Sequence, residues 1–299
     1  MPKKLEPKEF ELKDFVFGES PNAKLKKFKT KIPNLFKDEK SYKHEMHRRL
    51  QTLETEQEKL YASAAYSILI VFQGMDTSGK DGAIKHVMTG INPQGCDVTS
   101  FKKPSESDLK HDFLWRCYKN LPEKGKIGIF NRSYYEDVVA VRIHHDYLLS
   151  EKIPGQFTKK KKKFWNSRFE AINSFEEHLR QSGTEVIKIF LHLSKTEQKN
   201  RLLARIENES KNWKFSESDF TERQFWPEYL NAYTDCLKAT STVEIPWYVV
   251  PADEKKNCHY IVSEIIAMRL KKLHLKWPIV GKKQKSRLKE LKKLIQKAD

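Results

Sequence analysis

The chain has few of the residues that cross-link a protein or bind zinc. It contains four cysteines in 299 residues, and none of them forms a Cys-x-x-Cys pair. Such wide spacing argues against a zinc knuckle and, in a cytosolic protein, against a disulfide framework. We therefore expect the thiols to be buried or half-buried small apolar groups: Cys96, Cys117, Cys236 and Cys258.

Long apolar segments are also missing. The longest nearly uncharged stretch, residues 61–75, is interrupted by Ser63, Ser67 and Gln73. It falls short of the roughly 20 apolar residues that a membrane-spanning helix needs. The first residues carry positive charge without an apolar segment or a cleavage site, so they do not form a secretory signal. We expect a cytoplasmic protein without a membrane partner.

Acidic residues are outnumbered by basic ones. The chain has 57 Lys and Arg against 40 Asp and Glu, a formal net charge of +17. This field attracts polyanions, and nucleic acid, acidic lipid and phosphate-rich small substrates all fit it. Part of the charge is clustered in five consecutive lysines at 159–163 and in a tail at 281–299 with net charge +6. The apolar residues of the tail predict an amphipathic helix with a solvated basic face: Leu288, Leu291, Leu294 and Ile295.

Short apolar runs alternate with longer segments along the chain. The run at 67–73, rich in β-branched residues and ended by Gly74, is typical of a strand buried on both faces. We interpret four further runs in the same way: 97–101, 127–130, 186–193 and 247–250. Because parallel strands need crossover connections, the pattern predicts an α/β doubly wound fold with a central parallel sheet.

The remaining segments predict helices and a simple domain organisation. The expected helices are 39–66, 80–89, 106–120, 159–182, 196–208, 222–240 and 256–274. The first 40 residues contain four prolines and no sustained periodicity. We therefore expect an N-terminal arm at 1–40, one domain at 41–275 and a basic C-terminal tail at 276–299.

A glycine-rich segment follows the first predicted strand. Gly74, Gly79 and Lys80 have the G-x-x-x-x-G-K spacing of a phosphate-binding loop, in which backbone N–H groups and a lysine hold phosphate oxygens. The alternative is a tight turn that needs glycine only for its backbone. The strand before it and the helix after it favour the phosphate loop. Its expected phosphate-binding residues are Gly74, Met75, Thr77, Ser78, Gly79, Asp81 and Gly82, and Lys80 adds a mobile positive charge.

Two acidic residues in this loop indicate a cation. Asp81 stands where Ser or Thr usually ligates magnesium, and Asp76 lies inside the loop. Carboxylates repel phosphate unless a cation lies between them, and Mg²⁺ prefers carboxylate and phosphate oxygens. We therefore expect Mg²⁺ as cofactor, with Asp76 as the preferred ligand.

A second polar motif follows the strand predicted at 127–130. Asn131 stands where many phosphate-loop enzymes have Asp, and Arg132 comes directly after it. An arginine here can neutralise charge on a transferred phosphoryl group. Taken alone, Arg132 fits a structural ion pair equally well.

The two motifs together closely resemble those of the polyphosphate kinase 2 family. They read Gly-Met-Asp-Thr-Ser-Gly-Lys-Asp-Gly at 74–82 and Phe-Asn-Arg-Ser-Tyr-Tyr-Glu-Asp-Val at 130–138. The resemblance extends from about residue 42 to 273, with further motifs at 211–216, 226–233 and 240–253. It implies a P-loop kinase-like, thymidylate-kinase-like three-layer α/β/α fold with a helical lid. It also implies Mg²⁺-dependent phosphoryl transfer between inorganic polyphosphate and nucleotides.

The resemblance also implies the roles of individual residues. It makes Asp76, Lys80, Arg132 and Glu136 the catalytic residues, with Mg²⁺ held by Asp76 with help from Glu136 or Asn131, and Asn131 is also a phosphate- or nucleotide-binding candidate. Family members with Asp and Asn at the positions of Asn131 and Glu136 are chiefly single-step nucleoside diphosphate kinases. The present motif looks like the branch that phosphorylates both AMP and ADP, giving ADP and ATP. We also expect a homo-oligomer, either a dimer or a tetramer.

Basic residues between 201 and 223 predict a lid at about 206–222. Arg201 and Arg205 share one face of a predicted helix, and a closing cationic segment keeps water from a transferring phosphoryl group. A surface helix with an arginine stripe is the alternative. Given the resemblance, further phosphate- or nucleotide-binding candidates are Arg205, Lys211 and Arg223, together with Lys103 and Arg116 near the carboxyl end of the second strand.

Two other functions fit parts of the sequence. An ATP-dependent nucleotide kinase also has a phosphate loop and magnesium, and a nucleic-acid-binding phosphate-loop protein accounts for the charge. The chain lacks a recognisable nucleic-acid-binding motif, and its aromatic residues do not interleave with the basic runs, so we expect no nucleic-acid partner. Adjacent side chains at 144–146 point in different directions, which favours a polar loop over a metal site there.

Overall fold

A five-stranded parallel sheet forms the centre of the fold. The computed structural model describes residues 10–18 and 23–297. The strands lie in the order β2-β3-β1-β4-β5. Their bounds are β1 Ser67–Gln73, β2 Cys96–Ser100, β3 Ile127–Asn131, β4 Thr184–His192 and β5 Trp247–Pro251. This confirms the predicted α/β fold with a central parallel sheet.

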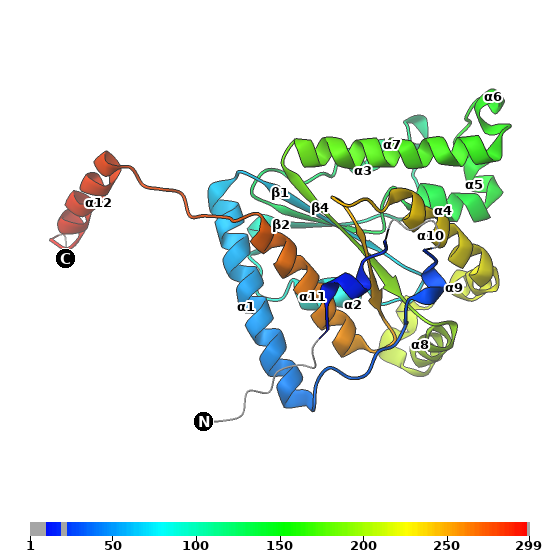
Figure 1. Cartoon of the computed structure of the whole chain (residues 1–299), viewed down its shortest axis with the longest axis horizontal. Coiled ribbons are helices and arrows are strands. Elements are labelled where there is room, and N and C mark those ends of the chain that lie inside the picture. Colours follow the sequence, from blue (N-terminus) through cyan, green and yellow to red (C-terminus); the bar gives the residue numbers. More distant parts are fainter. Residues whose placement is uncertain (1–9, 19–22, 298–299) are drawn as a thin grey trace.

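Helices cover both faces of the sheet (Figure 1). Alternate residues of β1 belong to different apolar clusters, Ile68 and Ile70 to one and Leu69 and Val71 to the other, because successive side chains point to opposite faces. The first cluster includes residues from α1 (Glu39–Ser63), α2 (Lys80–Val87) and α11 (Lys255–Lys272). The second includes residues from α4 (Glu136–Ile143), α7 (Lys161–Gln181) and α10 (Trp226–Thr240).

The remaining α-helices lie outside these two layers. They are α3 Trp115–Tyr118, α5 His145–Ser150, α6 Gly155–Thr158, α8 Lys195–Glu207, α9 Glu217–Glu222 and α12 Lys282–Ile295. In the arm, Phe15, Phe17 and Leu25 are buried against the body. Residues 1–9 and 19–22 of the predicted arm and 298–299 of the predicted tail lie outside the described residues. Among the described helices, none is both long and apolar enough to cross a membrane.

Three sequence predictions need correction. β2 is an edge strand with exposed and half-buried residues, Val98 being 52% exposed, so it is not buried on both faces. The helix predicted at 106–120 is reduced to a single 3₁₀ turn and α3, because the backbone is extended at His111 and the Asp112 side chain then accepts from Leu114 N–H, which starts a new turn. The polar loop predicted at 144–146 contains the start of α5.

The four cysteines behave as predicted. All are free, with Cys96 half-buried and the other three buried. Burial raises the pKa of the Cys96 thiol to about 11 and that of Cys258 to about 12. Both groups are therefore neutral thiols at neutral pH.

A fully buried ion pair joins β4 to α7. Lys188 Nζ lies 2.7 Å from Glu176 Oε2 and donates to Thr240 O at 2.5 Å. Tyr134 and Tyr135 donate their hydroxyls to Glu176 Oε1 at 2.8 and 2.6 Å. These bonds compensate the buried charges and fix the turn after β3 against α7.

We expect Lys188→Ala to lower the free energy of unfolding by about 3–5 kcal/mol, because it leaves the Glu176 carboxylate buried without its cation. Urea denaturation measures the change. Arg180→Ala is the matched control, since it breaks the exposed pair between Arg180 and Glu177 on the same helix and should cost much less. Equal effects of the two substitutions would contradict the prediction.

Candidate functional site

The site begins at the carboxyl ends of β1 and β3. Phe72 pairs with Asn131 in the parallel register, so the loop after β1 and the turn after β3 are neighbours. β1 has β3 on one side and β4 on the other, and the strand order reverses there. In open α/β sheets, ligands bind at such a reversal, beyond the carboxyl ends of the strands.

The phosphate loop needs glycine at two positions. Gly74 and Gly79 have φ values of 151° and 98°, in the region that favours glycine. A Cβ atom on Gly74 would lie only 2.7 Å from Leu191 O, so the loop also needs the space. Ser78 N–H closes the turn by donating to Met75 O at 3.1 Å.

Lys80 is buried at the start of α2. Its Nζ donates to Gly74 O at 2.9 Å and to Met75 O at 3.3 Å. Burial, with repulsion from Arg132, lowers the pKa of Lys80 to about 8. A phosphate oxygen in place of a loop carbonyl would compensate the positive charge of Lys80 more fully, because the phosphate oxygen is itself negatively charged.

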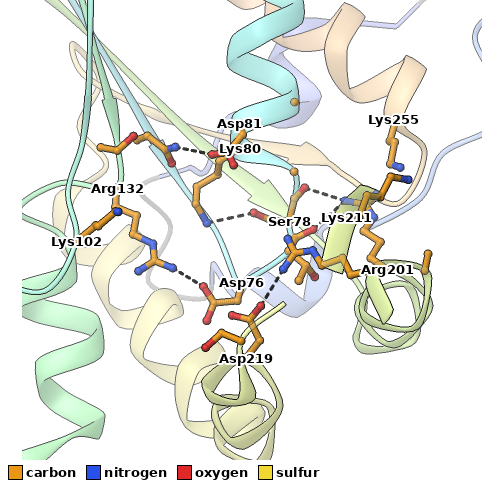
Figure 2. Close-up of a pocket in the computed structure, with 18 of the residues that line it drawn as sticks. Asp76, Ser78, Lys80, Asp81, Lys102, Arg132, Arg201, Lys211, Asp219 and Lys255 are labelled. Carbon is orange, nitrogen blue, oxygen red and sulfur yellow. Dashed lines mark hydrogen bonds and ion pairs between the residues drawn. The ribbon is translucent and has the colours of Figure 1, made fainter. Parts of the chain in front are cut away.

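Arg132 joins the two loops. Its Nη2 lies 2.5 Å from Asp76 Oδ1 (Figure 2). Its backbone has φ 63°, and its N–H donates to Phe72 O at 3.0 Å, so the turn points the side chain across the end of β1. Glu136 and Asp76 raise the pKa of the guanidinium, which is therefore always charged. With the Gln73 amide oriented so that its oxygen accepts from Ser133, its nitrogen donates to Glu136 Oε1 at 2.9 Å.

Asn131 and Asp81 bond each other. The Asn131 amide donates to Asp81 Oδ1 at 2.7 Å (Figure 2). Both replace residues that commonly hold magnesium in phosphate-loop enzymes, as the sequence indicated. Their mutual bond leaves Asp76 as the loop carboxylate nearest to Arg132.

Three cavities meet at Arg132, which lines all of them. The largest, of about 560 Å³, is lined by seven Lys and Arg side chains and three Asp side chains. A second cavity of about 210 Å³ includes Asp76 and Glu136, and a third of about 160 Å³ includes Glu136 and more apolar side chains.

The structure distributes the predicted site residues among these cavities. The residues that line the large cavity are Asp76, Thr77, Ser78, Gly79, Lys80, Asp81, Gly82, Asn131, Arg132, Arg205 and Lys211. Gly74, Met75 and Glu136 line the second cavity. Lys103 and Arg116 line the third.

Lys211, Ser216 and Asp219 of the predicted lid segment line the large cavity, and an ion pair joins this segment to α8. Arg205 Nη1 lies 2.8 Å from Asp219 Oδ2, so the end of α8 is bonded to α9. Burial and the nearby Asp76 raise the pKa of Asp219. Arg223 is not among the lining residues of the three cavities. It donates to Lys195 O and to Gln198 Oε1 at 2.8 and 2.9 Å, and Gln198 donates to Asp76 O at 3.1 Å.

Arg116 is held inside the protein. It is buried, donates to Lys102 O at 2.8 Å and pairs with Asp137 at 3.3 Å. Burial raises the pKa of Asp137 to about 7, although Arg116 opposes the rise. The Lys103 ammonium lies 5.4 Å from the centre of the Tyr147 ring, on the wall of the third cavity.

Three further cations line the large cavity and were not among the predicted site residues: Lys102, Arg201 and Lys255. Lys102 and Lys255 follow β2 and β5, so the rule that ligands bind at the carboxyl ends of parallel strands could have identified them. Arg201 is bonded to Thr77 O and Ser78 O at 3.1 and 3.0 Å. It therefore holds two carbonyls of the phosphate loop.

The donor set is compatible with magnesium. Among the residues that the structure describes, no three His, Cys, Asp or Glu side chains form a complete metal site. Mg²⁺ is commonly held by one or two carboxylates, with phosphate oxygens and water completing the shell. Asp76 and Glu136 both line the second cavity and supply this minimal set.

Comparisons with known proteins agree with this geometry. Residues 36–277 match the family model described as polyphosphate kinase 2. The chain is 48% identical over 268 residues to an ADP-polyphosphate phosphotransferase of Rhodopseudomonas palustris, covering 89% of this chain and 92% of that protein. It is 41% identical over 233 residues to an AMP/ADP-polyphosphate phosphotransferase of Meiothermus ruber, covering 78% and 81%. The crystal structure of polyphosphate kinase 2 from Arthrobacter aurescens superposes with a TM-score of 0.82 at 34% identity, covering 92% of this chain and 94% of that one.

We expect phosphate binding to depend on the charge of Lys80. The pKa of this ammonium is lowered to about 8, so in the free protein its charge is lost as the pH rises through 8. Calorimetry with inorganic tripolyphosphate should therefore show that the wild type loses affinity as the pH rises from 7 to 9. Lys80→Arg should lose less affinity over the same range. Lys85→Arg, on the exposed face of the same helix, controls for titration of the ligand and should behave as wild type. The same pH dependence of tripolyphosphate affinity in Lys80→Arg and Lys85→Arg would refute a role for the charge of Lys80.

Proposed function

This chain belongs to the polyphosphate kinase 2 family, and from this membership we propose that it transfers the terminal phosphoryl group of inorganic polyphosphate to AMP and ADP. The products are ADP and ATP, the reaction is reversible and Mg²⁺ is the cofactor. The observation that carries the proposal is the meeting of three cavities at one arginine, Arg132.

The large cavity suits the polyphosphate donor. A chain of phosphates has no base or sugar to recognise, so its binding depends on positive charge spread over several subsites. The seven cations of this cavity supply that charge, and Lys102, Lys211 and Lys255 extend it beyond the phosphate loop. Three aspartates lie among them, which favours a metal ion between the carboxylates and the phosphates.

The two smaller cavities suit the nucleotide acceptor. The third cavity has Phe101, Leu109, Val141 and Tyr147 in its wall, and small-molecule sites are lined mainly by such apolar and aromatic side chains. It shares Arg132 and Glu136 with the second cavity. A nucleoside in the third cavity therefore has its phosphate near Arg132, facing the donor.

The chemistry consists mainly of positioning and charge stabilisation. A phosphate oxygen of the nucleotide attacks the terminal phosphorus of polyphosphate in line with the bridging oxygen, the bridging P–O bond breaks, and the shortened polyphosphate leaves. Lys80 and Arg132 stabilise negative charge on the transferred group. Asp76 orients Arg132 through the bond at 2.5 Å. Bound by Asp76 and Glu136, Mg²⁺ would neutralise phosphate charge.

The proposal that AMP is an acceptor depends on Glu136. The relative from Rhodopseudomonas palustris is named for ADP alone and that from Meiothermus ruber for both AMP and ADP. Glu136 lines both acceptor-side cavities and accepts a hydrogen bond from Gln73, which supports the proposal that its carboxylate binds the acceptor group or its metal.

Three further properties belong to this proposal. Segment 206–222 acts as the lid, with the arm at 1–40 and the tail at 276–299 outside the catalytic domain. The enzyme is a cytoplasmic homo-oligomer, a dimer or a tetramer. Free cysteines support the reducing compartment, and light scattering measures the oligomeric state.

We expect purified protein to form ADP and then ATP from AMP, Mg²⁺ and polyphosphate without added ATP. Phosphorus NMR follows both products and the loss of polyphosphate. Lys80→Ala and Asp76→Ala should each lower turnover by orders of magnitude, whereas Lys85→Ala should not. A requirement for ATP as donor would instead identify an ATP-dependent nucleotide kinase.

We expect Glu136→Asn to impair the reaction with AMP more than that with ADP, because Glu136 faces the acceptor side. The measurement is kcat/KM for each nucleotide at saturating polyphosphate. Asp235→Asn, an exposed residue paired with Arg142, is a control for removing a carboxylate elsewhere. An equal loss with AMP and ADP would refute a role in acceptor choice.

A further inference from the structure

The basic C-terminal helix α12 has no role in the site described above. It extends away from the body at the end of a segment that follows α11 (Figure 1). None of its described residues is buried. Its 14 residues span about 21 Å at 1.5 Å per residue.

One face of α12 is apolar and exposed. Leu288, Leu291, Leu294 and Ile295 are 51%, 38%, 58% and 68% exposed. At 100° per residue they fall within a single sector of the helix, about 120° wide. Trp277 and Ile279 in the preceding segment are also exposed, at 53% and 92%.

The opposite face and the flanks of the stripe are cationic. Seven lysine and arginine residues and one glutamate occur between Lys282 and Ile295. Lys285, Lys289 and Lys293 lie opposite the stripe, Lys283 and Lys292 border it on its two sides, and Arg287 lies just inside one edge of it. Any surface that covers the leucines therefore meets a row of positive charges, so it must be apolar in its interior and anionic at its edge.

A second copy of this chain does not meet that requirement. Two α12 helices paired along their stripes bring the bordering cations of each helix together, and like charges at these positions are destabilising. Of the net charge of +17, the tail from 281 carries +6 and the other 280 residues +11, so the body of a second copy is also basic. Free polyphosphate meets the charge but leaves the leucines in water.

We propose that α12 is a peripheral anchor that lies on an anionic lipid surface. A short helix with Leu and Ile on one face and Lys and Arg on the other lies in the plane of the interface, with its apolar face among the acyl chains. Anionic headgroups attract each lysine and arginine near the surface. Trp277, exposed in the segment just before α12, is a residue type that is favoured at such an interface. An anionic membrane surface thereby becomes a partner, in contrast to the expectation from the sequence that the protein has no membrane partner.

Vesicle binding by the full chain tests this proposal. The wild type should float with vesicles of phosphatidylglycerol and phosphatidylcholine and not with vesicles of phosphatidylcholine alone. Leu288→Gln combined with Leu291→Gln keeps the charge and the helix propensity. It should weaken binding at least tenfold, with polyphosphate-dependent activity in solution unchanged.

Two charge variants separate the tail from the rest of the basic surface. Lys289→Gln, Lys292→Gln and Lys293→Gln together should also weaken binding at least tenfold. The matched control removes the same charge from the exposed lysine run of the body, as Lys160→Gln, Lys162→Gln and Lys163→Gln, and should change binding less than threefold.

Three results would overturn the proposal. The first is no binding of the wild type to anionic vesicles. The second is full binding by the leucine double variant, which would mean adsorption by charge alone. The third is oligomer dissociation in the leucine double variant without any vesicle binding by the wild type, which would place the stripe between copies of the chain. The first result leaves the enzymatic proposal untouched, because activity is measured separately.

Discussion

The parallel pairing of β1 with β3 is the constraint on which the site depends. It places Phe72 beside Asn131 and thereby brings the phosphate loop within 2.5 Å of Arg132, through Asp76. Behind this contact, Glu176 accepts hydrogen bonds from Tyr134 and Tyr135, in the turn that carries Arg132, and is itself paired with Lys188. The buried hydrogen bonds of Glu176 therefore support the same turn that presents Arg132 to the phosphate loop.

The site concentrates charge in a way that a polyanionic ligand relieves. Burial, with repulsion from Arg132, lowers the pKa of Lys80 to about 8, and further cations line the same cavity. Asp76 compensates part of this charge before substrate binds. A phosphate chain with a divalent cation can complete the compensation, because it supplies negative charge where the cations lie and positive charge where the carboxylates lie.

Much of the site could be predicted from the sequence because its signals are local. The spacing of Gly74, Gly79 and Lys80 needs only a strand before it and a helix after it, and both are present. Contacts between distant segments had no such signal. Arg201 holds the phosphate loop from α8, and Arg116 is turned inward by Asp137, which follows from tertiary packing alone. The sequence did not predict that β2 is an edge strand for the same reason, because the apolar pattern of one strand does not determine the order of the strands in the sheet.

The central claim is that donor and acceptor meet at Arg132 from opposite sides. A crystal structure with Mg²⁺, AMP and a methylene-bridged polyphosphate analogue tests it most directly. We predict the terminal phosphate of the analogue between Lys80 and Arg132, its chain along the large cavity, and the AMP phosphate on the side of Glu136. An AMP phosphate inside the loop at 74–80, or an analogue bound outside the cation-rich cavity, would contradict the claim.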